Sequence, residues 1–184
     1  LFLQAESSGL TNSPCSTGSV EVRYNSANKL AWNTEASGVA TAGVNFINQP
    51  KVQVQDTYGN NVTSATNAIT LKGYSDSCST QDTTFSVTQT SADFADVAGA
   101  AEFTDAKSTT VAATLFLQAE SSGLTNSPCS TGSVEIRYNS ANKLAWNTEA
   151  SGVATAGVNF INQPKVQVQD TYGNNVTSAT NAIT

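Results

Sequence analysis

The sequence contains no histidine among its 184 residues. Histidine is the side chain that most often transfers protons near neutral pH, and it is a common ligand of zinc and other metals. Its absence excludes histidine-based acid–base catalysis and histidine-ligated metal sites. The numerous serine and threonine hydroxyls also have no histidine to activate them as nucleophiles. We therefore expect no enzymatic activity and no cofactor.

Basic residues and long apolar runs are also scarce. Eight Lys and Arg residues stand against 14 Asp and Glu residues, which gives a net charge of −6 and an isoelectric point near 4.4. Nucleic-acid-binding domains normally carry a basic surface, so we expect no nucleic-acid partner. No apolar run approaches the ~18 residues that a membrane-spanning helix needs, so we expect no membrane span in this chain.

A long internal repeat is the main feature that is present. Residues 1–70 recur as residues 115–184, an offset of 114, and Val22 and Ile136 form the one pair that differs. Each copy has a net charge of −1 and the intervening residues 71–114 have one of −4, so a full period carries −5. A period of 114 residues is close to the usual size of one domain. The chain thus corresponds to about one and a half units of a tandem array.

The polar pattern along the unit predicts β-strands. Residues 20–24, 51–55 and 115–119 alternate between polar and apolar side chains, with the period of two that is typical of strands. Runs rich in Gly, Asn, Ser and Thr separate them, and no segment keeps the apolar period of a helix. The Ala-rich residues 95–101 contain Gly99, so we expect no helix there either. Short strands between turn residues predict an all-β antiparallel sandwich.

The weakest joint in the period is the polar segment of residues 139–142, which follows a strand ending at Tyr138 and corresponds to residues 25–28. A linker this short restricts the angles between two domains, so an array is expected to behave as a semi-rigid rod. Boundaries at this joint divide the chain into the closing strands of one domain, a complete domain and the opening strands of the next: residues 1–24, 25–138 and 139–184.

A strand followed by a turn carries a resemblance to a known family. Residues 49–56 (QPKVQVQD) precede Tyr58-Gly59-Asn60 and Val62. This pattern resembles the signature of bacterial immunoglobulin-like repeats, which build giant surface adhesins and invasin-like proteins. Further segments are similar to the family in the same order, so that the resemblance spans the whole unit: residues 29–31, Gly99, Ala101, Phe103 and residues 119–125. The opening strand departs from the family pattern at residues 32–35 (WNTE).

The resemblance implies an immunoglobulin-like β-sandwich, repeated in tandem at the bacterial cell surface, that acts as a spacer or a fibre. The implied partners are neighbouring identical repeats, in the same or adjacent chains, and a host or cell-surface ligand. One alternative is a carbohydrate- or receptor-binding module, for which Trp32 and Tyr74 are the conspicuous aromatic candidates. Another is a filament of separate subunits that complete one another by strand addition. We favour the continuous array.

The residues after the strand at 51–55 have two interpretations. Asp56 can accept hydrogen bonds from turn amides, Gly59 supplies a positive φ, and Asn60 tolerates the left-handed region, so the segment predicts a tight turn. The alternative is a calcium site, because Asp56, Asn60 and Asn61 offer oxygen ligands. One carboxylate is thin support for a divalent cation, and we favour the turn. We interpret the glycosylation sequon at residues 61–63 as a coincidence.

The three cysteines become an even number once the repeat is considered. One period contains Cys78 and Cys129, separated by 51 residues, and Cys15 is the copy of Cys129. We predict a Cys78–Cys129 disulfide, which suits an oxidising exterior. Two buried free thiols are the alternative.

Two other kinds of chemistry have candidate residues in the sequence. A pair of carboxylates could serve a glycosidase, but the candidate acids are accompanied by no aromatic platform, and we interpret them as a solvated face: Asp93, Asp96, Glu102 and Asp105. An intramolecular crosslink between lysine and asparagine needs a buried lysine beside an acid. Lys29 and Lys51 are candidates for it by residue type alone.

Overall fold

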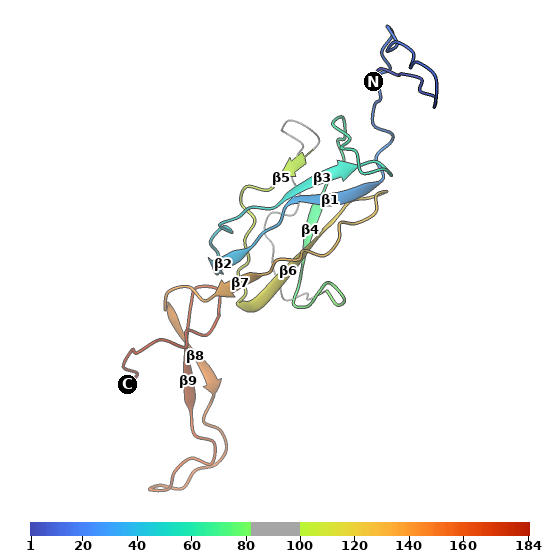
Figure 1. Ribbon diagram of the computed structural model, residues 1–184. Helices are drawn as coiled ribbons and strands as arrows, with labels where there is room; N and C mark the ends of the chain where they lie inside the picture. Colours follow the sequence, from blue (N-terminus) through green and yellow to red (C-terminus); the bar gives the residue numbers. More distant parts are fainter. Residues whose placement is uncertain (82–99) are drawn as a thin grey trace.

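The computed structural model describes residues 1–81 and 100–184, and within these ranges the chain is all-β, without a helical segment. One sheet has three antiparallel strands, in the order β1 (Lys29–Thr34), β3 (Lys51–Gln55) and β5 (Ala100–Glu102). A second sheet has four strands, in the order β2 (Gly38–Thr41), β7 (Val134–Arg137), β6 (Ala112–Glu120) and β4 (Thr70–Tyr74). A third sheet pairs β8 (Lys143–Thr148) with β9 (Lys165–Gln169) (Figure 1).

The predicted alternation is visible in the strands of the two larger sheets. In β3, Val52 and Val54 are fully buried and the polar residues between them are half-buried. In β6, Leu115, Leu117 and Ala119 face the core in the same way. Side chains of a strand point alternately to its two faces, so this period places all the apolar residues on one side. The pairing is antiparallel as expected, except that β2 runs parallel to β7.

Both larger sheets contribute to one hydrophobic core. Leu30 and Val52 come from the three-stranded sheet, and Leu117 and Ile136 come from the four-stranded sheet. Phe103, which follows β5, is the largest of the fully buried side chains. Two layers around a common core fit a β-sandwich. The residues of this cluster fall between positions 30 and 136.

Residues 1–24 differ in structure from residues 115–138, although Val22 and Ile136 are the one pair at which the two segments differ in sequence. The expectation of a strand at residues 20–24 was wrong for this copy, because none is present in residues 1–24, whereas the corresponding β7 is a strand. Val20 is 53% exposed and its counterpart Val134 is 1% exposed. The reason is tertiary: β7 lies between β2 and β6, while Val20 exchanges backbone hydrogen bonds with Leu1 away from the core.

The second copy of the opening strands repeats the local pairing of the first. Lys143 faces Gln169 in the β8–β9 pair just as Lys29 faces Gln55 in the β1–β3 pair, and both pairs have an irregularity before their last threonine. Burial differs, because Leu30 is 1% exposed and Leu144 is 57% exposed. Residues 1–24 and the β8–β9 sheet lie at opposite ends of the two core sheets (Figure 1).

Candidate functional site

The turn after β3 is built around the carboxylate of Asp56. Asp56 is fully buried. One carboxylate oxygen accepts hydrogen bonds from the backbone N–H groups of Tyr58 and Asn60, each at 2.9 Å. The other oxygen accepts from the Asn60 side-chain amide and from the backbone N–H of Asn25, each at 3.0 Å. Gly59 has a φ of 89°, the left-handed conformation that the sequence predicted there.

These hydrogen bonds determine the charge state of the carboxyl group. Donation from the Asn25 backbone, followed by donation from Asn60, lowers the pKa of Asp56 from 3.8 to about 2. Asp170 is the same residue in the second copy, and its turn has the same bonds. Burial raises the pKa of Asp170, but donation from Asn139 and Asn174 outweighs it, so the pKa is lowered overall. Both carboxylates are therefore held in the ionised form.

Two of the three calcium candidates, Asp56 and Asn61, already accept hydrogen bonds with their side-chain oxygens. Both oxygens of Asp56 already accept N–H groups, and one of those donors is the Asn60 side-chain amide. The side-chain oxygen of Asn61 accepts from the Gln55 side chain at 3.4 Å. Among the residues that the structure describes, no three His, Cys, Asp or Glu side chains cluster as metal ligands. The observed geometry favours the turn interpretation.

The aspartate turn also holds the start of the linker. In the second copy, the backbone N–H of Asn139, the first linker residue, donates to Asp170 across 31 positions of the chain. Tyr138, just before the linker, accepts a hydrogen bond from Thr177, which follows the turn. Because one carboxylate accepts hydrogen bonds from both the turn and Asn139, the segment that follows β7 is tied to the turn that follows β9.

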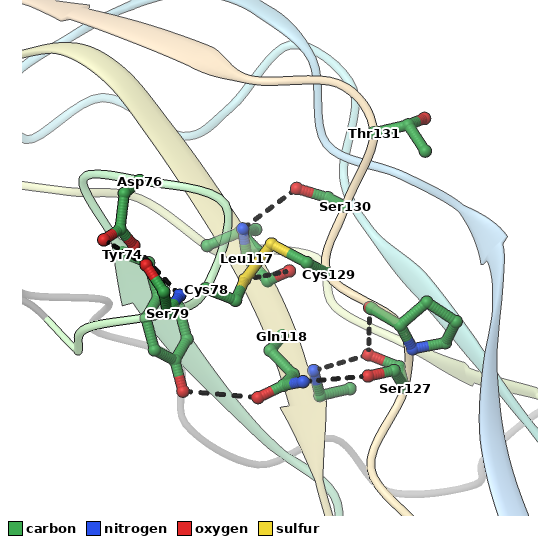
Figure 2. The surroundings of a disulfide bond; sticks show 12 residues. Tyr74, Asp76, Cys78, Ser79, Leu117, Gln118, Ser127, Cys129, Ser130 and Thr131 are labelled. Atoms are coloured by element: carbon green, nitrogen blue, oxygen red, sulfur yellow. Dashed lines mark hydrogen bonds between the residues drawn. A yellow bond between two sulfur atoms is a disulfide. The ribbon is translucent and has the colours of Figure 1, made fainter.

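The structure contains the predicted disulfide between Cys78 and Cys129, whose Cα atoms are 5.7 Å apart (Figure 2). Cys78 lies in the turn after β4, where Asp76 accepts hydrogen bonds from Ser79. Cys129 lies in the segment that runs beside β6. Cys15, the copy of Cys129, is an exposed free thiol. The bond therefore joins the repeated part of the unit to residues 71–114.

Two serines attach the Cys129 segment to β6. The Ser127 and Ser130 hydroxyls accept the backbone N–H groups of Ala119 and Leu117, and their own N–H groups donate back to the carbonyls of the same residues. Figure 2 shows Ser127 and Ser130 on either side of Cys129. The arrangement satisfies buried backbone groups without a regular strand. Ser13 and Ser16 make the same contacts in the first copy.

Two residues whose role the sequence did not identify bind the segment around Cys129 from the side of the three-stranded sheet. The indole N–H of Trp32 donates to the Pro128 carbonyl at 2.8 Å. One carboxylate oxygen of Glu35 accepts from the backbone and hydroxyl of Thr131 and from the backbone of Gly132, at 2.8 to 2.9 Å. The available signal was the departure from the family pattern at residues 32–35, which lies at these two contacts.

The aromatic candidates for ligand binding do not form an exposed platform. Tyr74 is buried, and its hydroxyl donates to Gln118, so the interpretation of Tyr74 as an exposed aromatic was wrong. Trp32 is half-buried against Pro128. Tyr74 pairs with Phe116 at the end of β4 and reaches Gln118, so it is buried on the face of the sheet opposite the core residues Leu117 and Ala119, which the sequence alone does not fix.

The remaining candidates have ordinary surroundings where the structure describes them. Asp93 and Asp96 lie outside the described residues, as do residues 95–99 of the Ala-rich stretch, while Ala100 begins β5. Glu102 forms a 3.0 Å ion pair with Lys51, and both side chains are more than a third exposed. Lys29 is half-buried. Lys51 therefore has an acid beside it but lacks the burial that a crosslink requires.

A scan against protein-family models finds no match to this chain, and a search of curated proteins finds no significantly similar sequence. In the described ranges, no helix has the length and apolar character needed to cross a bilayer. The geometry of the chain itself is therefore the basis for the functional argument.

Proposed function

We propose that the protein is a non-catalytic structural repeat of an extracellular bacterial surface fibre or adhesin, with an immunoglobulin-like β-sandwich as its unit. Successive 114-residue repeats follow one another in one polypeptide, and each acts as a semi-rigid spacer. The observation that carries this proposal is the near-identity of the two copies, which agree at 69 of 70 positions. An array that spans a distance depends on the number of uniform units, whereas binding sites with separate tasks would diverge.

The fold supports the proposal in two ways. The core is closed by residues between positions 30 and 136, which gives each unit a hydrophobic interior of its own. The neighbouring segments leave this unit at opposite ends, as a linear array requires (Figure 1). The disulfide agrees with an oxidising environment outside the cytoplasm. Neighbouring repeats are the proposed partners, and an adhesive ligand would bind elsewhere in the fibre.

Small-angle scattering tests the spacer function directly. Chains of one, two and four repeats are expected to show a maximum dimension that rises almost linearly with the number of repeats, because short linkers restrict bending. A flexible chain would instead lengthen with the square root of that number. A square-root dependence would contradict the proposal. The single repeat serves as the control for the size of the unit.

Exposed apolar residues favour a second candidate, assembly of separate subunits by strand addition. Leu144 and Phe160 are exposed in the second copy, whereas Leu30 and Phe46 are buried in the first. In our proposal, later segments of the same polypeptide cover them. In the alternative, another chain does so. Denaturing electrophoresis of reduced native material distinguishes the two: one very large polypeptide supports the array, and a ladder of small subunits supports strand addition.

A further inference from the structure

The aspartate turn has a different environment in each copy. In the first copy it projects into solvent, and Tyr58 is 81% exposed. In the second copy the identical turn lies against the end of the preceding unit, and Tyr172 is 47% exposed. We infer that this turn is the element through which each repeat docks onto the repeat before it. The surface that it contacts there is formed by residues 42–43 and 109–111, which we call the loop face, and the contact gives the joint between units a fixed angle. The inference rests on the proposed function in that its partner is another copy of the repeat.

The side chain of Asn174 makes the most specific contact at this joint. Its oxygen accepts a hydrogen bond from the backbone N–H of Val111 at 3.1 Å, and its amide nitrogen donates to the Thr109 carbonyl at 2.8 Å. The same nitrogen donates to Asp170 within the turn. An asparagine amide has one acceptor and two donors, and here every type of group is used. The asparagine thus orders its own turn and binds the backbone of the preceding unit.

The ring of Tyr172 packs over Gly43, in the turn after β2. A β-carbon at Gly43 would overlap the tyrosine ring, so a residue with no side chain is needed for the approach. Gly43 also has a φ of 79°, and its N–H donates to the Ser108 carbonyl. That bond joins the glycine turn to the loop that Asn174 contacts, so the two form one surface.

This surface, the loop face of residues 42–43 and 109–111, is held by hydrogen bonds within its own unit. Ser108 is fully buried, and its hydroxyl accepts the backbone N–H of Thr110 and donates to the Thr110 carbonyl. The loop face also contacts the linker, because the side-chain amide of Asn139 donates to the Ala42 carbonyl at 3.1 Å. β2 and β7 lie at the end of the core sheets nearest to β8 and β9 (Figure 1). Turn, linker and loop face therefore meet at a single joint.

The first copy presents the same chemical groups without a partner from residues 42–43 or 109–111. Tyr58, Gly59 and Asn60 have the same turn bonds as their counterparts in the second copy. No residues of this chain stand 114 positions before residues 42–43 and 109–111, so the first turn has no loop face of an earlier repeat to contact. The exposed turn at residues 58–60 is accordingly the surface that fits the loop face of a preceding repeat.

Hydroxyl-radical footprinting of the full chain tests the docking. Trypsin releases residues 52–72 and 166–184 as different peptides with one tyrosine each, so Tyr58 and Tyr172 are measured separately. We expect Tyr172 to be labelled more slowly than Tyr58. In Gly43→Ala the ratio of the two rates is expected to approach one, because the new methyl group displaces the ring. Gly157→Ala is the matched control: Gly157 has the same φ of 79°, but a β-carbon there would have no atom within 4 Å, so the ratio should not change.

A second pair of variants separates docking from turn stability. Asn174→Ala removes the acceptor of the Val111 N–H and should speed hydrogen exchange at that amide, whereas Asn60→Ala disrupts the equivalent turn bonds and should leave it unchanged. Equal labelling of Tyr58 and Tyr172 in the unaltered chain, or unchanged exchange at Val111 in Asn174→Ala, would overturn the docking. Linear growth in scattering would still support the spacer function in that case. Protected Tyr172 with non-linear growth would overturn the spacer function and leave the docking intact.

Discussion

At the scale of single residues, one buried carboxylate organises a whole turn by accepting several hydrogen bonds. Asp56 is fully buried, yet each of its carboxylate oxygens accepts two hydrogen bonds, so its charge is compensated by N–H groups rather than by a cation. Burying a carboxylate without such partners would be strongly unfavourable. The same reasoning explains why an asparagine, which supplies both a backbone and a side-chain donor, stands four positions later.

The depressed pKa of Asp56 predicts a specific pH dependence of stability. Because the folded-state pKa is about 2 and the ordinary value is 3.8, the ionised carboxylate stabilises the fold above about pH 4, and this contribution is lost as the pH falls toward 2. We expect Asp56→Asn to have a lower urea midpoint than the unaltered chain at pH 7, with the difference shrinking between pH 4 and 2. A difference independent of pH would contradict this, and other acids affect both proteins alike.

At the scale of elements, the segment around Cys129 is held from three sides. Serine hydroxyls bond it to β6, Trp32 and Glu35 bond it to the end of β1, and the disulfide joins it to the turn after β4. These contacts join strands of both core sheets. The segment therefore replaces a regular strand at this position by a combination of side-chain hydrogen bonds and one covalent bond.

The disulfide is expected to contribute measurably to stability. Closing a loop with a separation of 51 residues stabilises a fold by ~4 kcal/mol in the chain-entropy model. Replacing Cys78 and Cys129 by serine should lower the free energy of unfolding by about this amount, as measured by denaturant titration. Cys15→Ser is the matched control and should have no effect, because Cys15 is exposed and unbonded. A comparable loss of stability in the Cys15→Ser control would argue against a stabilising role of the Cys78–Cys129 disulfide.

The two copies of the opening strands allow a second comparison at this scale. Leu30→Ala removes a fully buried side chain and should cost about 2–5 kcal/mol of stability. Leu144→Ala changes the same residue in the same register, but at an exposed site, and should cost less than about 0.5 kcal/mol. Denaturant titration of the full chain measures both. Equal effects would mean that the β8–β9 surface is covered in solution.

At the scale of the whole molecule, the joint between successive units of the proposed array decides how the chain extends. The linker is pinned by Asp170, and the turn of one unit contacts the loop face of the unit before it through Asn174 and Tyr172. Short linkers limit bending, and a contact interface limits it further. Repeated along an array, one fixed angle produces a regular rod.

This arrangement predicts that a small change at the joint alters the length of an array. Gly43→Ala in every unit of a four-repeat chain should shorten the mean end-to-end distance, because each joint loses its docked contact and samples more angles. Scattering measures the change against the unaltered four-repeat chain. A single repeat with the same substitution controls for folding, since positive φ makes alanine unfavourable at this position. An unchanged length would show that the linker alone sets the angle.

The duplicated sequence separates what the amino acids determine locally from what needs the tertiary structure. The aspartate turn, the paired serines and the strand register recur in both copies, because their hydrogen bonds join residues close together along the chain or in adjacent strands. Sequence reasoning found the turn and the disulfide partners in advance. It also found the alternation in β3 and β6, since period-two patterns depend on strand geometry alone.

Burial, pairing of distant strands and docking were decided only by the tertiary structure. Val20 and Val134 have the same adjacent residues in sequence, but only Val134 belongs to a strand that lies between two others. Tyr74 is buried although its pairing with Phe116 places it on the face of β4 opposite the core. The contacts of Trp32 and Glu35 span almost a hundred positions, and their one trace in the sequence was the departure from the family pattern at residues 32–35. The physical reason is that apolar burial requires surfaces supplied by distant segments. Phe103 and Ala106, which belong to the core, lie in residues 71–114, a segment that occurs once in this chain.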